Sequence, residues 1–264
     1  MPDKLSVVII TKNESANIRC CLESVKWADE LIVVDSGSTD ATVPICEEFS
    51  CKILHRDWDG YASQKNFAIS QATGDWILSL DADEVVTDEL HSEIAGILNG
   101  KASYDAYKIP RRNFFLGKPM TRGGWYPDCQ LRLFRRDIGE FAVIPLHEHI
   151  RFYNADTKVG RLSNDMLHHT YPSIRDFVAK ADRYTNIEVD AMLKEGRRPK
   201  SLIFSMVTCF PMKFVEVYLY KGGWKDGIHG FVAATLMAAR VFMRNAKLWE
   251  AISRANGLQK KARN

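Results

Sequence analysis

Two carboxylates separated by one residue, Asp81 and Asp83, follow an apolar run from Trp76 to Leu80. The run has the composition of a buried strand, and ligands of open α/β sheets bind at the carboxyl ends of such strands. Carboxylate oxygens suit a hard divalent cation, which would in turn hold the phosphates of a nucleotide. One acid can serve the metal and the other a ribose, although Asp-x-Asp also fits a strand that simply runs into a turn.

Polar side chains also follow two earlier apolar runs, at residues 5–10 and 31–34. Those that can hydrogen-bond a ligand are Thr11, Asn13, Glu14, Asp35 and Ser36. An aspartate can accept the imide N–H of a uracil, and asparagine and threonine can donate to its carbonyls. Each residue alone is equally typical of a turn, but their convergence at neighbouring strand ends predicts a site for a nucleotide base.

The elements that must hold these residues alternate between strand and helix. Apolar β-branched runs predict strands at residues 5–10, 31–34 and 51–55, and the helical spacing between them indicates a parallel sheet with right-handed crossovers. Neither Gly-x-Gly-x-x-Gly nor Gly-x-x-x-x-Gly-Lys-Ser/Thr follows the first strand. This absence argues against a dinucleotide-binding dehydrogenase and against a P-loop.

Composition limits the class of protein further. The 264 residues are 46% hydrophobic and 26% charged, which suits one large globular domain or a domain with a smaller appendage. A net charge of +3 is too small to indicate nucleic acid as a partner. The amino terminus runs into a strand without a basic-then-apolar leader, so we expect a cytoplasmic protein.

Four motifs in this order resemble the inverting family 2 glycosyltransferases. They are Ser6-Val-Val-Ile-Ile-Thr-Lys-Asn-Glu14, Val33-Val-Asp-Ser-Gly-Ser-Thr-Asp-Ala-Thr42, Gln64-Lys-Asn66 with Ala72-Thr-Gly-Asp-Trp76, and Leu80-Asp-Ala-Asp-Glu84. The resemblance implies an α/β protein with a GT-A fold, in which helices flank a Rossmann-like, mostly parallel sheet. It also implies a nucleotide-diphosphate-sugar donor and a divalent cation, Mg²⁺ or Mn²⁺.

The family pattern also implies roles for single residues. Asp81 would contact the donor ribose and Asp83 the metal. The residues that would bind the rest of the donor are Thr11, Asn13, Glu14, Asp35 and Lys65.

A narrower resemblance extends into the second half of the chain. Three segments look like the bacterial lipopolysaccharide core β-glucosyltransferases: Gly124-Trp-Tyr-Pro-Asp-Cys-Gln-Leu-Arg-Leu-Phe134, His147-Glu148 and Gly222-Gly-Trp-Lys-Asp-Gly-Ile-His-Gly-Phe231. The likeness implies glucose from a UDP-linked donor and a lipid-linked saccharide acceptor such as the lipopolysaccharide inner core. Another cell-envelope glycan is the alternative acceptor. The Gln-x-x-Arg-Trp signature of processive synthases is replaced by Gln130-Leu-Arg-Leu-Phe134, which indicates addition of a single sugar.

Arginines and aromatic residues are dense between residues 106 and 141. Guanidinium groups bind phosphate and aromatic faces stack on sugar rings, so we expect Arg132 and Trp125 to contact an anionic saccharide acceptor. The alternative is an edge region of the sheet whose arginines lie in solvent or on structural carboxylates.

The catalytic base and a second metal ligand are also expected in this half. An inverting transfer needs a carboxylate that takes the proton of the acceptor hydroxyl. Resemblance to the acidic acceptor-side position of the family points to Asp128, although Pro127 replaces the usual glutamate before it. Glu148 is the alternative base or an acceptor clamp. The resemblance to GT-A enzymes, which often recruit a late histidine for the metal, makes His168 a candidate second metal ligand, and a purely structural histidine is the alternative.

The tail differs in composition, so we expect a catalytic domain at residues 1–170 and a helical region at residues 171–264. Charges interrupt the apolar stretch from Leu202 to Tyr220, which favours an interfacial or packed helix over a spanning one. Basic residues cluster after residue 240 and favour docking on an anionic membrane surface, at the cytoplasmic face of the inner membrane. A helical hairpin packed on the sheet is the alternative.

Two other classes of protein stay open at this point. A sugar nucleotidyltransferase also uses nucleotides, Mg²⁺ and a similar sheet, but it would need a glycine-rich basic loop that residues 11–15 lack. A non-catalytic membrane adaptor would explain the tail but not the carboxylates at positions 81 and 83.

Overall fold

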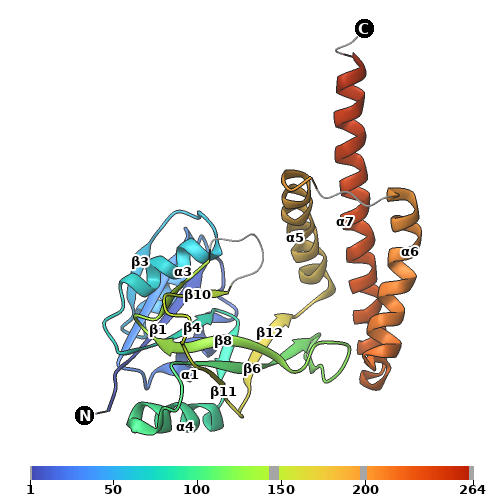
Figure 1. Cartoon of the computed structure of the whole chain (residues 1–264). Coiled ribbons are helices and arrows are strands. Elements are labelled where there is room, and N and C mark those ends of the chain that lie inside the picture. The colour runs from blue at the N-terminus through green and yellow to red at the C-terminus, as the bar shows by residue number, and fades with distance from the viewer. Residues whose placement is uncertain (1, 143–148, 197–200, 262–264) are drawn as a thin grey trace. The chain divides into compact units, whose positions relative to one another are not determined.

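The computed structural model describes residues 2–142, 149–196 and 201–261 (Figure 1). The chain forms two compact units. The N-terminal unit contains residues 1–113 and 127–170, and the C-terminal unit contains residues 114–126 and 171–264. The segment 114–126 therefore groups with the C-terminal helices, which the sequence-based division at residue 170 did not anticipate.

Four parallel strands form one half of a mixed sheet in the N-terminal unit, in the order β3-β2-β1-β4. They are β1 (Leu5–Thr11), β2 (Glu30–Asp35), β3 (Lys52–His55) and β4 (Trp76–Asp81). β1 is buried over its whole length, and β4 is buried except for its last residue. Such apolar strands form because both faces of the sheet are covered. The three strands predicted from apolar runs are confirmed.

The sheet continues beyond β4 with the strands β8-β6-β12-β5, and β4 is antiparallel to β8. Their bounds are β5 (Glu84–Val86), β6 (Ala106–Phe115), β8 (Asp128–Arg135) and β12 (Met166–Tyr171). The short strands β7 (Lys118–Pro119) and β11 (Val159–Arg161) pair with β6, and β9 (Gly139–Phe141) pairs with β10 (Ile150–Phe152). This half of the sheet brings residues distant in sequence beside the end of β4.

Helices cover both faces of the parallel strands. Successive strand residues point to opposite faces, so Val7 and Ile9 of β1 join one apolar cluster while Val8 and Ile10 join another. The first cluster includes residues of α1 (Ile18–Val25), α2 (Thr42–Glu47), α4 (Asp88–Gly96) and the short turn η1 (Ile97–Lys101), and the second includes residues of α3 (Tyr61–Ser70). The predicted α/β class with a mostly parallel sheet is confirmed.

The C-terminal unit is dominated by the helices α5 (Ile174–Lys194), α6 (Leu202–Val215) and α7 (Ile228–Lys261). Figure 1 shows α6 lying along α7, and the turns η2 (Glu216–Tyr220) and η3 (Gly223–Asp226) join them. The Ser173 hydroxyl caps α5 by accepting the backbone N–H of Asp176 at 3.1 Å, as the sequence predicts.

The segment 114–126 is held by the turn before α7. The buried Asp226 carboxylate accepts the backbone N–H groups of Thr121 and Arg122 at 3.1 and 2.9 Å. The Lys118 ammonium donates to the main-chain carbonyl of Asp226 at 2.9 Å. An apolar cluster completes this unit and contains Phe115, Met120, Trp125, Phe177, Ala181 and Ala233.

Candidate active site

The carboxyl ends of β1, β2 and β4 lie at one edge of the sheet. Thr11 of β1 pairs with Asp35 of β2, and Ile10 of β1 pairs with Asp81 of β4. Neighbouring strands are about 4.8 Å apart, so the backbones of Asp35 and Asp81 are about 10 Å apart. The residues predicted to bind the donor from these three strands therefore share one edge.

The loop after β2 is built on the Asp35 carboxylate, which is 5% exposed. Its Oδ2 accepts the backbone N–H groups of Gly37 and Ser38 at 2.9 Å, and its Oδ1 accepts the Ser38 hydroxyl at 2.5 Å. Gly37 has a φ of +82°, which glycine adopts without strain. A carboxylate offers about four acceptor positions, so these three hydrogen bonds leave one for the N–H of a bound base.

Two hydroxyl groups at the same strand ends lack a protein partner. Thr11 Oγ1 and Ser36 Oγ are buried and make no hydrogen bond within the part of the chain that the structure describes. An unpaired buried polar group costs about 1–3 kcal/mol. A nucleotide base or ribose would supply the missing partner, so these hydroxyls fit the predicted base site.

Asn13 and Glu14 shape the loop that follows β1. Asn13 has a φ of +57°, and its Oδ1 accepts the backbone N–H of Thr39 at 2.8 Å. Glu14 Oε2 accepts the side-chain amide of Asn17, and the backbone N–H of Glu14 donates to Thr42. Both residues therefore tie the loop after β1 together and to the loop after β2. Their direct contact with the donor stays a prediction.

The Asp81 carboxylate lies between two cations. Its Oδ1 is 2.9 Å from Lys65 Nζ, and its Oδ2 accepts a hydrogen bond from Arg132. The Lys65 and Arg132 side chains are 1% and 5% exposed. Desolvation raises the pKa of Asp81, but the charges of Arg132 and Lys65 outweigh it and hold that pKa well below its usual value. The acid is therefore ionised at neutral pH and held in place from two sides.

Glu84, to which the sequence analysis assigned no role, connects the charged side chains. It is fully buried, and its Oε1 accepts from Arg132 at 2.6 Å and from Arg111 at 3.0 Å. Its Oε2 accepts the backbone N–H of Asp81 at 2.9 Å. A buried carboxylate is tolerated only with such partners. The sequence feature that could have pointed to Glu84 is its position as a third acid directly after Asp-x-Asp, at the start of the strand Glu84–Val86.

Asp128, the predicted base, begins β8 and is hydrogen-bonded on both oxygens. Arg111 donates to Oδ2 from Nη2 at 2.5 Å and from Nε at 3.0 Å, and Gln130 donates to Oδ1 at 2.6 Å. Desolvation raises the pKa of Asp128, but the Arg111 charge and these hydrogen bonds lower it below the ordinary value. The carboxylate is thus ionised at neutral pH, and its side chain is 28% exposed. A proton acceptor needs both conditions.

Asp83 faces His168, which β12 supplies. These are the two side chains predicted to bind metal, and Asp83 Oδ2 lies 3.3 Å from His168 Nε2. Two ligand atoms in adjacent octahedral positions, each about 2.1 Å from the cation, are about 3 Å apart. The observed separation therefore fits a shared Mg²⁺ or Mn²⁺.

Asn113 sets the hydrogen-bonding state of His168. Its Nδ2 donates to Asp128 at 3.3 Å, which turns its Oδ1 toward His168 Nδ1 at 2.6 Å. A carbonyl oxygen can only accept, so Nδ1 donates to Asn113 in this arrangement, and the Nε2 edge of the ring faces Asp83.

In the part of the chain that the structure describes, the candidate metal site has only two protein ligands, Asp83 and His168. Among the described residues, no group of three or more His, Cys, Asp or Glu side chains is placed to hold a metal ion. Mg²⁺ often takes only one or two protein ligands and fills its other positions with water and phosphate oxygens. Asp83 and His168 fit such a site, in which the donor diphosphate would complete the shell.

Comparison with known proteins identifies the family. Residues 6–157 match the model described as glycosyl transferase family 2. The chain belongs to this family.

Relatives of this glycosyltransferase share most of its length. The lipopolysaccharide core biosynthesis glycosyltransferase LpsC of Rhizobium meliloti (strain 1021) is 29% identical over 93% of this chain and 92% of its own. An uncharacterized glycosyltransferase of Rickettsia bellii (strain RML369-C) is 35% identical over 94% of this chain and 86% of its own.

A solved structure shares the fold. The mannosyltransferase PcManGT from Pyrobaculum calidifontis, in complex with GDP-Man and Mn²⁺, has a TM-score of 0.51 and 15% sequence identity, and the match covers 99% of this chain and 80% of that one. The chain is therefore a family 2 glycosyltransferase with a GT-A fold.

Arg132 was predicted to bind the acceptor of this glycosyltransferase. In the structure its guanidinium is buried and bonds Asp81 and Glu84. The position favours holding the carboxylate at the end of β4, and contact with an acceptor stays a prediction.

The other two predicted acceptor residues are Trp125 and Glu148. Trp125 belongs to the C-terminal unit, where it is 8% exposed and its ring centroid lies 5.7 Å from that of Phe115 and 5.9 Å from that of Tyr171. Glu148 lies outside the described residues. Contact of either residue with the acceptor stays a prediction.

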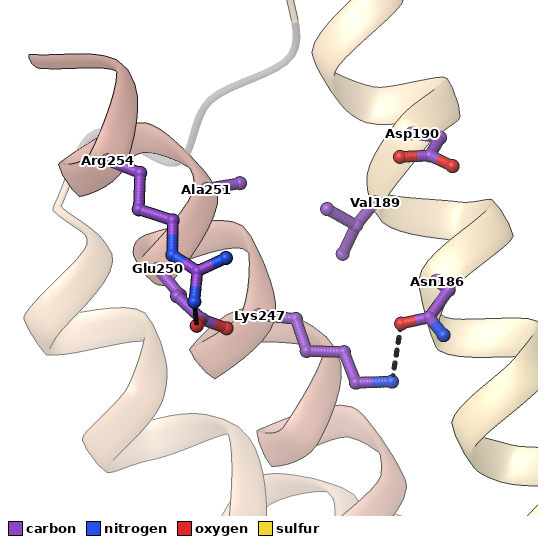
Figure 2. Close-up of a pocket in the computed structure, with 7 residues that line it drawn as sticks. All are labelled: Asn186, Val189, Asp190, Lys247, Glu250, Ala251 and Arg254. Atoms are coloured by element: carbon purple, nitrogen blue, oxygen red, sulfur yellow. Dashed lines mark hydrogen bonds and ion pairs between the residues drawn. The ribbon is translucent and has the colours of Figure 1, made fainter. Parts of the chain in front are cut away.

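A hollow of about 350 Å³ lies between α5 and α7 of the C-terminal unit. Figure 2 shows its lining, which consists of Asn186, Val189, Asp190, Lys247, Glu250, Ala251 and Arg254. Lys247 donates to Asn186 at 2.6 Å, and Arg254 pairs with Glu250 at 2.6 Å. Its cations thus bond groups of the helices themselves, and none of the predicted donor or metal residues lines it.

Proposed function

We propose that this family 2 glycosyltransferase transfers a single glucose, with inversion, from a UDP-linked donor to a lipid-linked saccharide such as the lipopolysaccharide inner core. The observation that carries the proposal is the series of contacts from Asp83 through His168 and Asn113 to Asp128. It joins the candidate metal pair to the candidate base within one unit. A transfer from a bound diphosphate to an acceptor hydroxyl requires this proximity.

Donor binding would use the strand ends of β1, β2 and β4. The unpaired hydroxyls of Thr11 and Ser36, and the remaining acceptor position of Asp35, would bind the uracil. Asp81 would bind the ribose, since Lys65 and Arg132 hold its carboxylate ionised at the end of β4.

Asp83 and His168 would hold Mg²⁺ or Mn²⁺. A bound cation neutralises negative charge on the leaving diphosphate. The contribution of the chain is to orient the ligands, because Asn113 fixes the imidazole and Asp83 stands on the turn directly after β4. PcManGT, which shares the fold, was solved with Mn²⁺.

Asp128 is the proposed general base. The acceptor hydroxyl oxygen would attack the anomeric carbon opposite the diphosphate, the bond from that carbon to the diphosphate oxygen would break, and the hydroxyl proton would pass to Asp128. The carboxylate must then lie about 2.6–3.2 Å from the hydroxyl. Arg111 and Gln130 hold it in a fixed orientation for this step.

The acceptor class is supported by similarity to LpsC, whose name assigns it to lipopolysaccharide core biosynthesis. Another cell-envelope glycan is the alternative acceptor. Membership of family 2 argues against the sugar nucleotidyltransferase and the membrane adaptor that the sequence had left open.

Substitution of Asp83 tests the proposal. Asp83→Ala should abolish cation-dependent turnover of a UDP-sugar, because His168 alone would retain the metal poorly, while the melting temperature stays close to that of the wild type. The assay would use Mn²⁺ or Mg²⁺, a panel of UDP- and GDP-linked sugars, and a core-type lipid acceptor. Asp57→Ala is the matched control, since the Asp57 side chain is fully exposed. Full turnover by Asp83→Ala would remove the metal site, and exclusive use of a GDP-sugar would remove the uracil assignment.

A further inference from the structure

Helix α6 has large apolar side chains exposed to solvent, while Ser205 faces α7. Ser205 accepts a hydrogen bond at 3.0 Å from Asn245 of α7, which is 2% exposed. Ile203, Phe204 and Val207 point away from the unit and are 70%, 69% and 70% exposed. A surface helix of a water-soluble protein has the opposite arrangement, with its apolar stripe against the core.

Five exposed residues form one stripe, which we call the outer face of α6, while the exposed Met212 lies outside it. It consists of Ile203, Phe204, Val207, Phe210 and Pro211. These positions are spaced i, i+1, i+4, i+7 and i+8, so they fall on one side of a helix with 3.6 residues per turn. No charged residue occupies the stripe.

Aromatic side chains continue the outer face onto α7. The Phe231 ring centroid lies 5.7 Å from those of Phe214 and Tyr218, which follow the outer-face residues at helical spacing. Phe242 stands eleven residues after Phe231, which is three helical turns further on the same side of α7, and both are 45% exposed. The α6–α7 hairpin therefore presents one extended apolar surface.

The turn between the helices adds residues typical of a membrane interface. Tyr220, Trp224 and Ile228 are 86%, 53% and 68% exposed. Lys225 lies over the Trp224 ring at 5.4 Å, and the nearby Lys221 is 46% exposed and pairs with Glu216 at 2.6 Å. Tryptophan and tyrosine concentrate at lipid headgroup level, and lysines there meet anionic lipid.

Two of the cations of α7 bond groups on α5, and docking of the basic residues on a membrane stays a prediction. Arg240 bonds Glu188 of α5, and Lys247 lies 2.7 Å from Asp182 of α5. These basic residues hold α7 against α5. These two cations are therefore partly neutralised within the unit, and the apolar surface is a separate feature.

A helix that crosses a bilayer is one alternative for α6. The stretch Ile203–Tyr220 is long and apolar enough to do so, and 6% of it is buried. However, α7 lies along α6, and the charged contacts between α7 and α5 would have to enter the hydrocarbon with it, at high cost. A helix pair parallel to the membrane plane buries the outer face without that cost.

We propose that the α6–α7 hairpin lies on a lipid bilayer, with the outer face of α6 immersed and Tyr220 and Trp224 at headgroup level. A bilayer is favoured over a second copy of the chain because the surface lacks charge while its turn carries paired aromatic and lysine side chains. The inference goes beyond the proposed sugar transfer, since it depends on no residue of the candidate active site. It gives a structural basis to the peripheral membrane localisation predicted from the sequence.

Vesicle sedimentation with the full-length protein tests the inference. The wild type should bind vesicles of phosphatidylcholine, and bind more tightly when phosphatidylglycerol is added. Phe204→Ser/Val207→Ser should lower the partition coefficient at least about tenfold on both vesicles, because two exposed apolar side chains no longer enter lipid. The control is Ile174→Ser/Val178→Ser on α5, whose side chains are 46% and 50% exposed. It should bind like the wild type.

Three results would overturn the inference. They are failure of the wild type to bind, an equal loss of binding in the α5 control, and binding to anionic vesicles alone that Phe204→Ser/Val207→Ser leaves unchanged. Sedimentation velocity without lipid tests the competing occupant, because a dimer that the same substitution dissociates would assign the face to a second copy. Hydrolysis of UDP-sugar in solution should be the same in both variants and the wild type, so failure of the sugar transfer and failure of membrane binding are distinguishable.

Discussion

The end of β4 and the α6–α7 hairpin both depart from the usual distribution of side chains, in opposite directions. At the end of β4, the titratable side chains Lys65, Arg132 and Glu84 are buried and paired with groups of opposite charge type. On the hairpin, large apolar groups such as Phe204 and Val207 are exposed. The first region buries charged groups away from water, and the second exposes apolar groups to water.

The two regions differ in how much their side chains depend on other groups of the protein. The buried charges are balanced within the chain, since three cations, Lys65, Arg111 and Arg132, face three acids, Asp81, Glu84 and Asp128. Removing one partner leaves another charge buried and unpaired. The exposed apolar groups have few partners in the unit to lose. Substitutions should therefore disturb the first region strongly and the second only when lipid is present.

The largest effect on activity is expected from substitution of the proposed general base, Asp128. Asp128→Asn should lower kcat by about 10²–10⁴-fold, because an amide of the same shape cannot accept the proton. Binding of UDP, measured by calorimetry, should stay unchanged. Asp137→Asn is the control, since that side chain is 83% exposed. If Asp128→Asn keeps most of its activity, the base is another group, and Glu148→Gln becomes the variant to measure.

A large loss of stability is expected from Glu84→Gln. The substitution keeps the shape but removes the charge shared by Arg111 and Arg132, so the free energy of unfolding should fall by about 3–5 kcal/mol. Urea denaturation measures it. Glu48→Gln is the matched control, because Glu48 pairs with Arg19 at 2.7 Å on the surface and should cost less than about 1 kcal/mol. Equal losses in both variants would contradict the balanced-charge account.

A smaller effect on stability is expected when the pH is lowered. The folded-state pKa of Asp81 is depressed, so its contribution to stability is complete above the ordinary aspartate pKa of about 4 and is lost as the pH falls below that value. Urea midpoints measured from neutral pH downward should therefore decline in acid. The decline should be shallower in Asp81→Asn, and an identical decline in both proteins would remove Asp81 as a cause.

The smallest effect is expected on the hairpin in the absence of lipid. Phe204→Ser/Val207→Ser should change the free energy of unfolding by no more than about 0.5 kcal/mol, since surface substitutions rarely do more. Phe134→Ala, at a fully buried ring of β8, should cost about 3–5 kcal/mol in the same urea assay. A loss above 2 kcal/mol in the hairpin variant would mean that the outer face packs against protein.

Much of the N-terminal unit was predictable because its strands are continuous apolar runs. The runs before Thr11, Asp35 and Asp81 mark strand ends, and parallel strands place such ends at one edge. The pairing of Asp83 with His168 was predicted from resemblance to the family and not from spacing, since 85 residues separate them. Glu84 received no role because a single buried acid has no periodic pattern.

The sequence by itself determined the α/β class, the strand ends that carry the polar residues and the family, because these depend on local periodicity and on short motifs. Only the tertiary structure decided which charges meet. The antiparallel strands β6, β8 and β12 bring Arg111, Asp128 and His168 to the end of β4, and no local pattern specifies that neighbourhood. The tertiary structure also decided the direction of α6, because an apolar helix can bury any side and only packing on α7 selects the face that stays outside.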